Sequence, residues 1–221
     1  PPLVSSHYQS LSGIRLKLKN RSVCTAILLM HKLFAKELTR QVCNYTLATA
    51  CILIGLKYDE ENGYKIRRVC HVAQSILASD APALTEGSEE VGELATGVGR
   101  LEFVAMREVG FQVNFDHPHS HLALMLQTLR AYMAEEFEKY PIARVAASLL
   151  RDCYVVPTLV LEYTPKVFAV AILSLAFKAF DVSVPMARSD WYEMFSASLS
   201  ERRLRHIERD ILLVVYGQKT D

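Results

Sequence analysis

The sequence predicts an all-α protein that consists of two similar helical domains, and three observations support this. Apolar residues recur at helical spacing, and no stretch shows the sustained alternation with period two that is typical of a strand. The two most apolar runs, residues 47–56 and 167–177, are shorter than the roughly 20 residues of a membrane span, so they predict core helices. Residues 48–57 also align without gaps on residues 169–178, which indicates an internal repeat, although chance similarity between two core helices is an alternative.

The first half of the chain is predicted to contain five helices, with the first core run in the third of them. Asn44 is expected to cap that helix, residues 59–63 are expected to form a turn, and residues 78–88 a loop. A helix that is apolar on all sides must be surrounded by others, so the remaining helices are expected to pack around it. The expected helices cover residues 8–19, 21–38, 44–58, 65–77 and 89–111.

The second half is predicted to repeat this arrangement after a short polar link. Pro118 and Pro141 fit the first turn of a helix, where a missing N–H costs nothing, and Thr164 is expected to cap the second core helix. Gly217 is the expected stop of the last helix. The expected helices cover residues 118–137, 141–156, 165–180, 190–197 and 201–216.

Length and composition fit one or two globular domains, and the charge does not favour binding to nucleic acid or membranes. Of 221 residues, 51% are hydrophobic and 22% charged, which provides ample apolar area for a core. We place the domains at residues 1–115 and 116–221. With 25 Lys and Arg against 24 Asp and Glu, the net charge is +1, so there is no overall positive field, and a partner must be recognised by local surface.

Cysteine usage and the N-terminal residues indicate a reducing compartment and no export. The five cysteines show no paired spacing of the kind that metal sites use, and four of them lie in apolar helical runs, as reduced thiols do. Residues 1–10 lack the basic segment followed by an apolar run that a secretory signal needs.

No pattern in the sequence predicts catalysis, a cofactor or a metal. There is no nucleophile motif and no glycine-rich phosphate loop, so we expect neither enzyme activity nor a small-molecule substrate. His117, His119 and His121 lie close together, but Pro118 separates the first two and no second cluster of ligands follows. We therefore expect these histidines to serve the start of a helix.

Glu102 is the most informative single residue, because its neighbours at helical spacing are apolar. A carboxylate on such a face needs a partner, and Lys57 is the one cation that adjoins the first core run. We expect an ion pair between Lys57 and Glu102, or that both face a polar partner surface. Alternatively, the lysine complements the dipole of its helix and the glutamate reaches water.

The last predicted helix has a basic side and an apolar side. Its basic residues are Arg202, Arg203, Arg205 and Arg209. Such a side is usually solvated. Contact with nucleic acid or with an acidic partner is the alternative, although no aromatic residues are interleaved with these arginines.

These features together resemble the cyclin family, whose fold consists of two tandem five-helix repeats called cyclin boxes. In cyclins the third helix ends in a lysine followed by acidic residues, as in Gly55-Leu-Lys57-Tyr-Asp-Glu-Glu61. The fifth helix carries a glutamate, an apolar stretch and a Gly-Phe ending, and residues 100–111, Arg-Leu-Glu-Phe-Val-Ala-Met-Arg-Glu-Val-Gly-Phe, are similar to this pattern. The resemblance covers residues 13–217 and implies an N-terminal cyclin box at 1–115 and a C-terminal box at 116–221. It does not extend to the substrate-docking patch of cell-cycle cyclins.

The resemblance implies a non-catalytic regulatory subunit that binds and activates a cyclin-dependent serine/threonine kinase. Residues 110–119 are similar to the transcription-type cyclins, and residues 111–113 and 149–154 are most similar to cyclin Q, with cyclins L, T and K next. Cyclin Q would imply the kinase conventionally numbered ten, a role in transcription regulation, and a nuclear location with the cytoplasm as a second one. The residues implied to contact the kinase are Lys57, Tyr58, Glu60, Glu102, Phe103, Met106, Arg107, Phe111 and Val113.

Two alternatives come from other classes of protein. A general transcription factor with the cyclin fold would clamp DNA and a polymerase-associated protein without a kinase, and its repeats would be more basic. The net charge of +1 and the match at Lys57 and Glu102 argue against it. A helical scaffold that binds neither class of partner would tolerate substitution of both residues.

Overall fold

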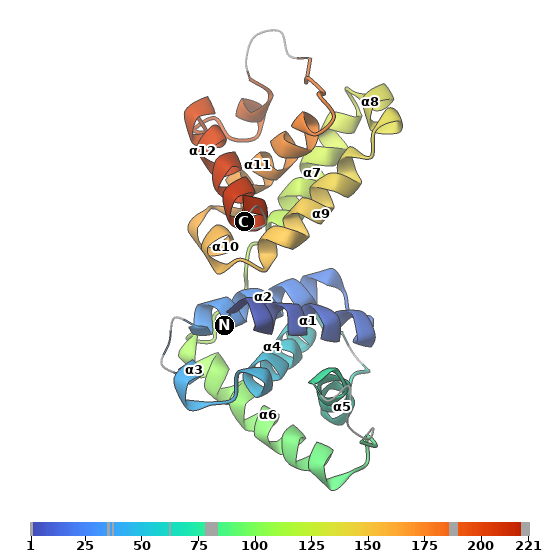
Figure 1. Ribbon diagram of the computed structural model, residues 1–221, viewed down its shortest axis with the longest axis vertical. Coiled ribbons are helices and arrows are strands. Elements are labelled where there is room, and N and C mark those ends of the chain that lie inside the picture. The colour runs from blue at the N-terminus through green and yellow to red at the C-terminus, as the bar shows by residue number, and fades with distance from the viewer. Residues whose placement is uncertain are drawn as a thin grey trace. The chain divides into compact units, whose positions relative to one another are not determined.

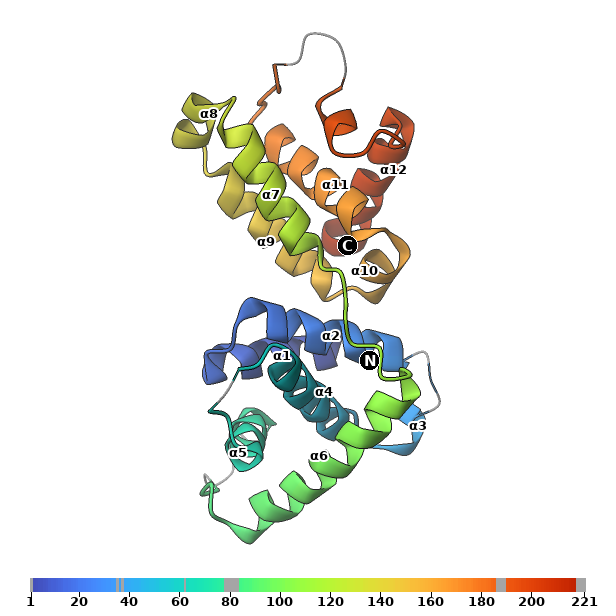
Figure 2. The ribbon, with the colours of Figure 1, turned by 180° about the vertical axis from the view of Figure 1, so that it is seen from behind.

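The protein is all-α and forms two compact units. The computed structural model describes residues 2–34, 36, 38–61, 63–77, 84–185 and 190–217, and its regular structure over these residues is helical, without a strand. The units are Pro1–Phe115 and Asp116–Asp221. Figures 1 and 2 show each unit as a set of helices around a central one, which is α4 in the first unit and α11 in the second. Among the described helices, none combines the length and the apolar character needed to cross a bilayer.

The first unit packs its helices around α4 (Asn44–Tyr58), as the apolar run predicts. Every residue from Leu47 to Leu56 is buried, and α1, α2, α5 and α6 all contact this helix. Ser88 begins α6, because its hydroxyl accepts a hydrogen bond from the N–H of Val91. The other helices of the unit are α1 (Pro2–Leu16), α2 (Asn20–Phe34), α3 (Leu38–Gln41), α5 (Ile66–Leu77) and α6 (Glu89–Glu108).

Gly55 allows α4 to approach α2 closely. A Cβ atom at this position would lie 2.4 Å from the backbone oxygen of Ser22, far inside van der Waals contact. Because the neighbouring atom is backbone, it cannot rotate away. A glycine is therefore required where the central helix crosses α2.

The second unit packs its helices around α11 (Pro165–Lys178), whose residues from Val167 to Phe177 are all buried. Helices α7, α9 and α12 contact this central helix. The other elements are α7 (Pro118–Arg130), α8 (Ala134–Lys139), α9 (Ile142–Tyr154), α10 (Pro157–Glu162), the 3-10 helix Trp191–Met194, α12 (Glu201–Ile211) and a π-helical turn at Leu212–Tyr216.

Two predicted long helices of the second unit are interrupted. The helix expected at 118–137 ends at Arg130, and the chain turns so that Met133 is buried before α8 begins. The helix expected at 141–156 ends at Tyr154, because a residue before a proline avoids the helical region and Pro157 starts α10. The described part of the second unit therefore contains more and shorter helices than the five expected.

Other predicted boundaries shift by a few residues. The helix expected at 8–19 begins at Pro2 and ends at Leu16, and the one expected at 21–38 ends at Phe34, with residues 35 and 37 outside the described part. The helix expected at 65–77 begins at Ile66, and the one expected at 165–180 ends at Lys178. In place of the helix expected at 190–197 there is only the 3-10 helix Trp191–Met194. The helix expected at 201–216 is α-helical only to Ile211. The helix expected at 89–111 ends at Glu108, because Gly110 and Phe111 have left-handed backbone, with φ of 62° and 59°. Of the predicted turn at 59–63 and loop at 78–88, residues 62 and 78–83 lie outside the described part.

Only some of the predicted helix caps are at the positions expected. Cys43, whose backbone is extended, holds the N-cap position of α4, so Asn44 is the first helical residue and was wrongly predicted as the cap. Thr164 holds the N-cap position of α11 but makes no capping hydrogen bond through its side chain. Gly217 has φ of −69°, so it does not end the last helix through a left-handed conformation.

Candidate functional site

A charged pair links the central helix of the first unit to α6. Lys57 lies in the last turn of α4, and its Nζ donates to Oε1 of Glu102 at 2.6 Å. The side chain of Glu102 is 17% exposed and that of Lys57 66% exposed, so the lysine covers the carboxylate from the solvent side. The ion pair expected from the sequence is therefore formed, and its position at a helix C-terminus adds a favourable interaction with the helix dipole.

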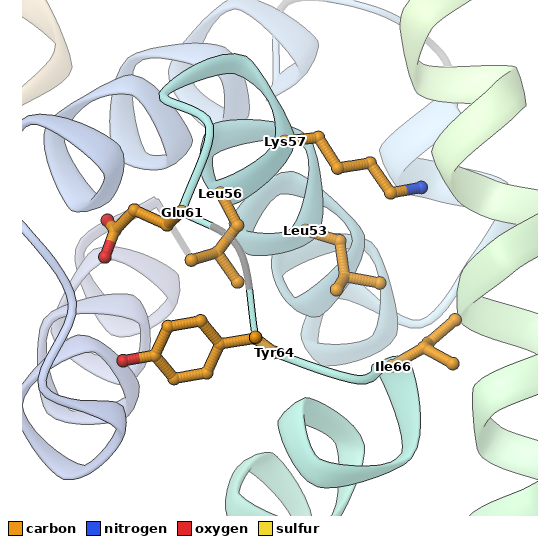
Figure 3. A pocket seen from close by; sticks show the side chains of 7 residues that line it. Leu53, Leu56, Lys57, Glu61, Tyr64 and Ile66 are labelled. Carbon is orange, nitrogen blue, oxygen red and sulfur yellow. The ribbon is translucent and has the colours of Figure 1, made fainter.

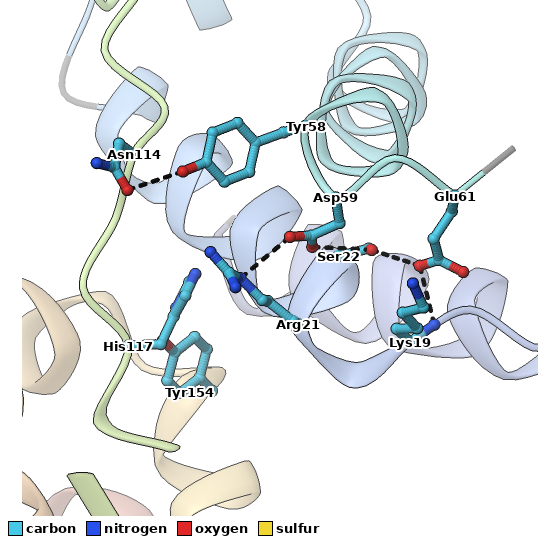
Figure 4. Close-up of polar contacts among 9 residues, drawn as sticks. All are labelled: Lys19, Arg21, Ser22, Tyr58, Asp59, Glu61, Asn114, His117 and Tyr154. Carbon is cyan, nitrogen blue, oxygen red and sulfur yellow. Dashed lines mark hydrogen bonds and ion pairs between the residues drawn. The ribbon is translucent and has the colours of Figure 1, made fainter. Parts of the chain in front are cut away.

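The turn that follows Lys57 is held against the start of α2 (Figure 4). Asp59 accepts a hydrogen bond from the hydroxyl of Ser22 at 2.9 Å and pairs with Nε of Arg21 at 3.0 Å. Glu61 accepts from the backbone N–H of Lys19 at 3.0 Å. Two of the three acidic residues of this turn are thus used to fix its backbone.

Glu60 and Tyr58, which belong to the same turn, differ in exposure and in their contacts. Glu60 is exposed and adopts a left-handed backbone with φ of 52°, which reverses the chain after the helix. Tyr58 is half-buried, and its hydroxyl donates to Oδ1 of Asn114 at 2.7 Å, which connects the turn to the segment after α6. The guanidinium of Arg21 lies 5.9 Å from the centre of the Tyr58 ring.

A small cavity opens beside Lys57 (Figure 3). Its volume is about 170 Å³, below the roughly 300 to 1,000 Å³ of typical small-molecule pockets. It therefore suits one side chain of a partner better than a cofactor. The lining residues are Leu53, Leu56, Lys57, Glu61, Gly63, Tyr64 and Ile66.

Two exposed aromatic rings lie on the same unit, at α6 and just after it. The side chains of Phe103 and Phe111 are 64% and 57% exposed, and their ring centres are 6.3 Å apart in an edge-to-face arrangement. Met106 and Val113 are half-buried, and Arg107 is exposed. Large apolar side chains at this level of exposure, side by side, are typical of a surface that binds another protein.

The structure thus brings together some of the residues singled out in the sequence. It pairs Lys57 with Glu102 and Phe103 with Phe111, and none of the nine residues is buried. The role of Ser22 in holding the acidic turn was not predicted, because no sequence signal connects the start of one helix to the end of another.

The second unit contains a corresponding pair that the sequence analysis missed. Lys178, which aligns with Lys57, ends α11 and donates to Oε2 of Glu208 on α12 at 2.5 Å. The turns match as well: the residue three positions after each lysine, Glu60 or Asp181, has φ of 52° and donates its N–H to the lysine's carbonyl. The alignment of the two lysines is the signal that would have predicted a second glutamate.

The three histidines lie at the start of α7, and the rings of His117 and His119 both neighbour Tyr154. His117 holds the N-cap position of α7, and its Nδ1 lies 2.6 Å from the hydroxyl of Tyr154. His121 pairs with Asp116 at 2.9 Å. Burial, and then the nearby His117, lower the pKa of His119 to about 4. Within the described part of the chain, no group of three potential ligands is placed to hold a metal ion.

Comparisons with known proteins agree with this architecture. No family model matches the sequence. The chain is 25% identical over 205 residues to "Cyclin-T1" of Mus musculus and 24% identical to that of Homo sapiens, in each case over 92% of this chain and 27% of the relative. It is 26% identical to "Cyclin-T" of Drosophila melanogaster, over 91% of this chain and 17% of the relative. The chain therefore spans about a quarter or less of the length of these relatives.

The fold is also similar to that of solved structures. A chain in the crystal structure of the yeast RNA polymerase II CTD kinase CTDK-1 complex superposes with a TM-score of 0.71, over 100% of this chain and 67% of that chain. The sequence identity is 16%, so this likeness concerns the fold.

Proposed function

We propose that this chain, a transcription-type cyclin in its fold and in its sequence similarity, is the regulatory subunit of a cyclin-dependent serine/threonine kinase. The observation that carries the proposal is the ion pair of Lys57 and Glu102, which lies at the surface beside exposed aromatic rings and a cavity of side-chain size. The group of kinases proposed is the transcription-associated one, since the relatives are cyclins T and the structure with the same fold belongs to a polymerase II kinase complex.

In this proposal the chain activates the kinase by positioning and contributes no catalytic group. Protein kinases need an ion pair between a lysine and a helix glutamate of the small lobe, together with an ordered activation loop. A partner surface that binds only the active orientation of that helix shifts the kinase population toward it. The first unit offers both kinds of contact that such a helix needs, namely a charged pair for its polar groups and apolar surface for its aliphatic side chains.

We assign the docking face to nine residues of the first unit, and we interpret units 1–115 and 116–221 as the two cyclin boxes. Support for the assignment comes from the burial pattern, since all nine side chains are exposed or half-buried. The fixed backbone of the turn after Lys57 would let Glu60 meet a partner without further ordering. The nine residues are Lys57, Tyr58, Glu60, Glu102, Phe103, Met106, Arg107, Phe111 and Val113.

The identity of the kinase is the finer part of the proposal. Residues 111–113 and 149–154 favour cyclin Q and hence the kinase conventionally numbered ten, whereas the relatives named above favour a kinase that pairs with a cyclin T. Either assignment is consistent with a nuclear location, which we propose together with a role in transcription regulation.

Affinity purification from nuclear extract tests the proposal. The wild-type chain is used as bait beside Glu102→Ala, with Glu93→Ala as a matched control, because Glu93 is an exposed carboxylate elsewhere on α6. We expect one cyclin-dependent kinase, identified by mass spectrometry and active in the eluate, with wild type and Glu93→Ala and not with Glu102→Ala. Recovery of polymerase and promoter factors without a kinase would instead favour the general transcription factor.

A further inference from the structure

The outer face of α12 and of the π-helical turn after it is not used by the proposed kinase contact, which lies in the other unit. Helix α12 turns Leu204, Ile207 and Ile211 inward, where all three are buried. The opposite face carries exposed arginines of the basic side that the sequence predicts. The exposed face comprises Arg202, Arg205, Arg209, Leu212 and Leu213.

The arginines form a row along the helix. Positions 202, 205 and 209 are three and four residues apart, so their side chains emerge from one face over about 10 Å of helix length. Arg205 pairs with Glu201 at 3.2 Å, but both side chains remain more than 60% exposed. Among the described residues, no carboxylate lies within ion-pair distance of Arg202 or Arg209. The row therefore has positive charge that is not neutralised within the unit.

The row continues into apolar surface. Leu212, Leu213 and Val214 are 47%, 52% and 39% exposed, and they belong to the π-helical turn Leu212–Tyr216. Short π-helical segments are uncommon and frequently accompany functional sites. The exposed leucines follow the basic row directly in the chain, so basic and apolar side chains are neighbours at this end of α12.

This combination distinguishes between classes of partner. A nucleic acid would neutralise the arginines through its phosphates, but it would cover the two leucines only where a base contacts them. A wholly apolar partner would bury the leucines and leave the arginine charges unpaired beside it. A helix with carboxylates along one half and aliphatic side chains along the other matches both halves, and arginine binds a carboxylate in bidentate geometry.

We propose that the face formed by α12 and its π-helical turn binds an acidic amphipathic helix of a protein partner. Carboxylates of that helix lie opposite the arginine row, and its aliphatic side chains lie on Leu212 and Leu213. The site belongs to the second unit and does not require that the first unit bind a kinase.

Synthetic peptides test this proposal on the full chain. The probe is a fluorescein-labelled 18-residue helical peptide (a length of about 27 Å) with glutamates over one half and leucines over the other half of the same face. One comparison peptide replaces the glutamates by glutamine, and a second replaces the leucines by serine. A labelled single-stranded RNA with one nucleotide for each residue of the peptide represents nucleic acids. Fluorescence anisotropy gives the affinity of each probe at low and high salt.

Matched variants locate the binding. The charge-reversal pair Arg202→Glu and Arg209→Glu, and separately Leu213→Ser, are expected to weaken the acidic peptide about tenfold or more. The control pair Arg130→Glu and Arg144→Glu changes the net charge equally at exposed positions on α7 and α9 and is expected to leave the affinity unchanged. Circular dichroism checks that each variant is folded.

Two sets of results decide the matter. Preference for the acidic peptide over both comparison peptides, lost in the α12 variants and kept in the control, supports the proposal. Equal binding of the glutamine peptide, no binding of any peptide, or tighter binding of RNA that depends on the same arginines would overturn it.

Discussion

Each unit ends its central helix with a lysine that reaches a glutamate on a later helix, but the two ion pairs lie in different surroundings. In the first unit, Glu102 is 17% exposed, and exposed Phe103 and Phe111 are on the same unit. In the second unit, the side chain of Glu208 is only 6% exposed, and its buried Oε1 has no hydrogen-bond partner among the described residues. The ion pair of the first unit is therefore open, meaning that its carboxylate is partly exposed, and the ion pair of the second unit is closed. Only the open pair is accessible to a partner.

An aromatic pair in each unit differs in the same way. Phe103 and Phe111 contact each other edge to face and remain exposed. After α11, Phe180 instead stacks on Tyr140 with ring centres 5.2 Å apart, so its ring is used within the unit. We infer that the exposed aromatic pair of the first unit serves the binding of a partner and that the stacked aromatic pair of the second unit stabilises the fold.

Substitution of the two lysines should change the free energy of unfolding to different extents, and the change in the second unit should be the largest of the predicted effects. Lys178→Met leaves the buried carboxylate of Glu208 unpaired and is expected to lower the free energy of unfolding by about 3 kcal/mol. Lys57→Met leaves a carboxylate that water can reach, so a loss of about 1 kcal/mol or less is expected. Urea denaturation of both variants measures this, and equal losses would contradict the distinction.

The two central helices should also differ in how they respond to a change between glycine and alanine at aligned positions. Gly55→Ala places a Cβ 2.4 Å from a backbone oxygen and is expected to destabilise the first unit by about 2 kcal/mol. The aligned residue Ala176 is fully buried without such a restriction, and Ala176→Gly should cost about 1 kcal/mol. Thermal unfolding followed by circular dichroism measures both. A Gly55→Ala variant as stable as wild type would show that the helices do not approach as described.

The second unit should lose stability in mild acid through His119. Its pKa of about 4 in the folded state lies below the ordinary histidine pKa of 6.5, so the unfolded chain binds the proton more tightly. The stabilising contribution is complete above pH 6.5 and is lost as the pH falls toward 4, by about 2 kcal/mol at pH 5. His119→Phe should weaken this pH dependence of urea denaturation, whereas His121→Gln, which changes a half-buried histidine paired with exposed Asp116, should retain it. An unchanged pH profile in His119→Phe would refute the assignment.

Truncation of exposed rings should have the smallest effect on stability. Phe103→Ser together with Phe111→Ser removes two exposed side chains, so we expect a change in unfolding free energy within about 0.5 kcal/mol. The affinity for the kinase should nevertheless fall about tenfold, because aromatic residues on docking surfaces contribute strongly to binding. Leu124→Ser, a change of similar exposure in the second unit, is the control and should leave the affinity unaltered. Affinity equal to wild type in the double variant would place the docking face elsewhere.

The parts of the fold that were predictable from the sequence are those with strong local signals. The central helices α4 and α11 were predicted because a run that is apolar on every side has to be enclosed. The pairing of Lys57 with Glu102 was predicted because a carboxylate on an apolar face requires a cation within reach.

The parts that were not predictable depend on contacts between distant residues. The short helices α8 and α10 arise where the chain turns to bury Met133 or to accommodate Pro157. Glu208 lies among charged residues on α12, so its burial against α11 has no signature in the local sequence, and only the alignment of Lys178 with Lys57 points to such a glutamate. The same holds for Ser22, whose hydroxyl fixes a turn that is 37 residues away along the chain.

Direct binding of purified kinase tests the central claim, namely that the open pair of the first unit is the docking site. The kinase recovered with the wild-type chain is titrated with wild type, Glu102→Ala and Glu93→Ala, and the phosphorylation rate is followed in the same samples. Our account predicts that Glu102→Ala weakens binding about a hundredfold, with activation lost in parallel, while Glu93→Ala behaves as wild type. Unchanged affinity and full activation with Glu102→Ala would contradict it.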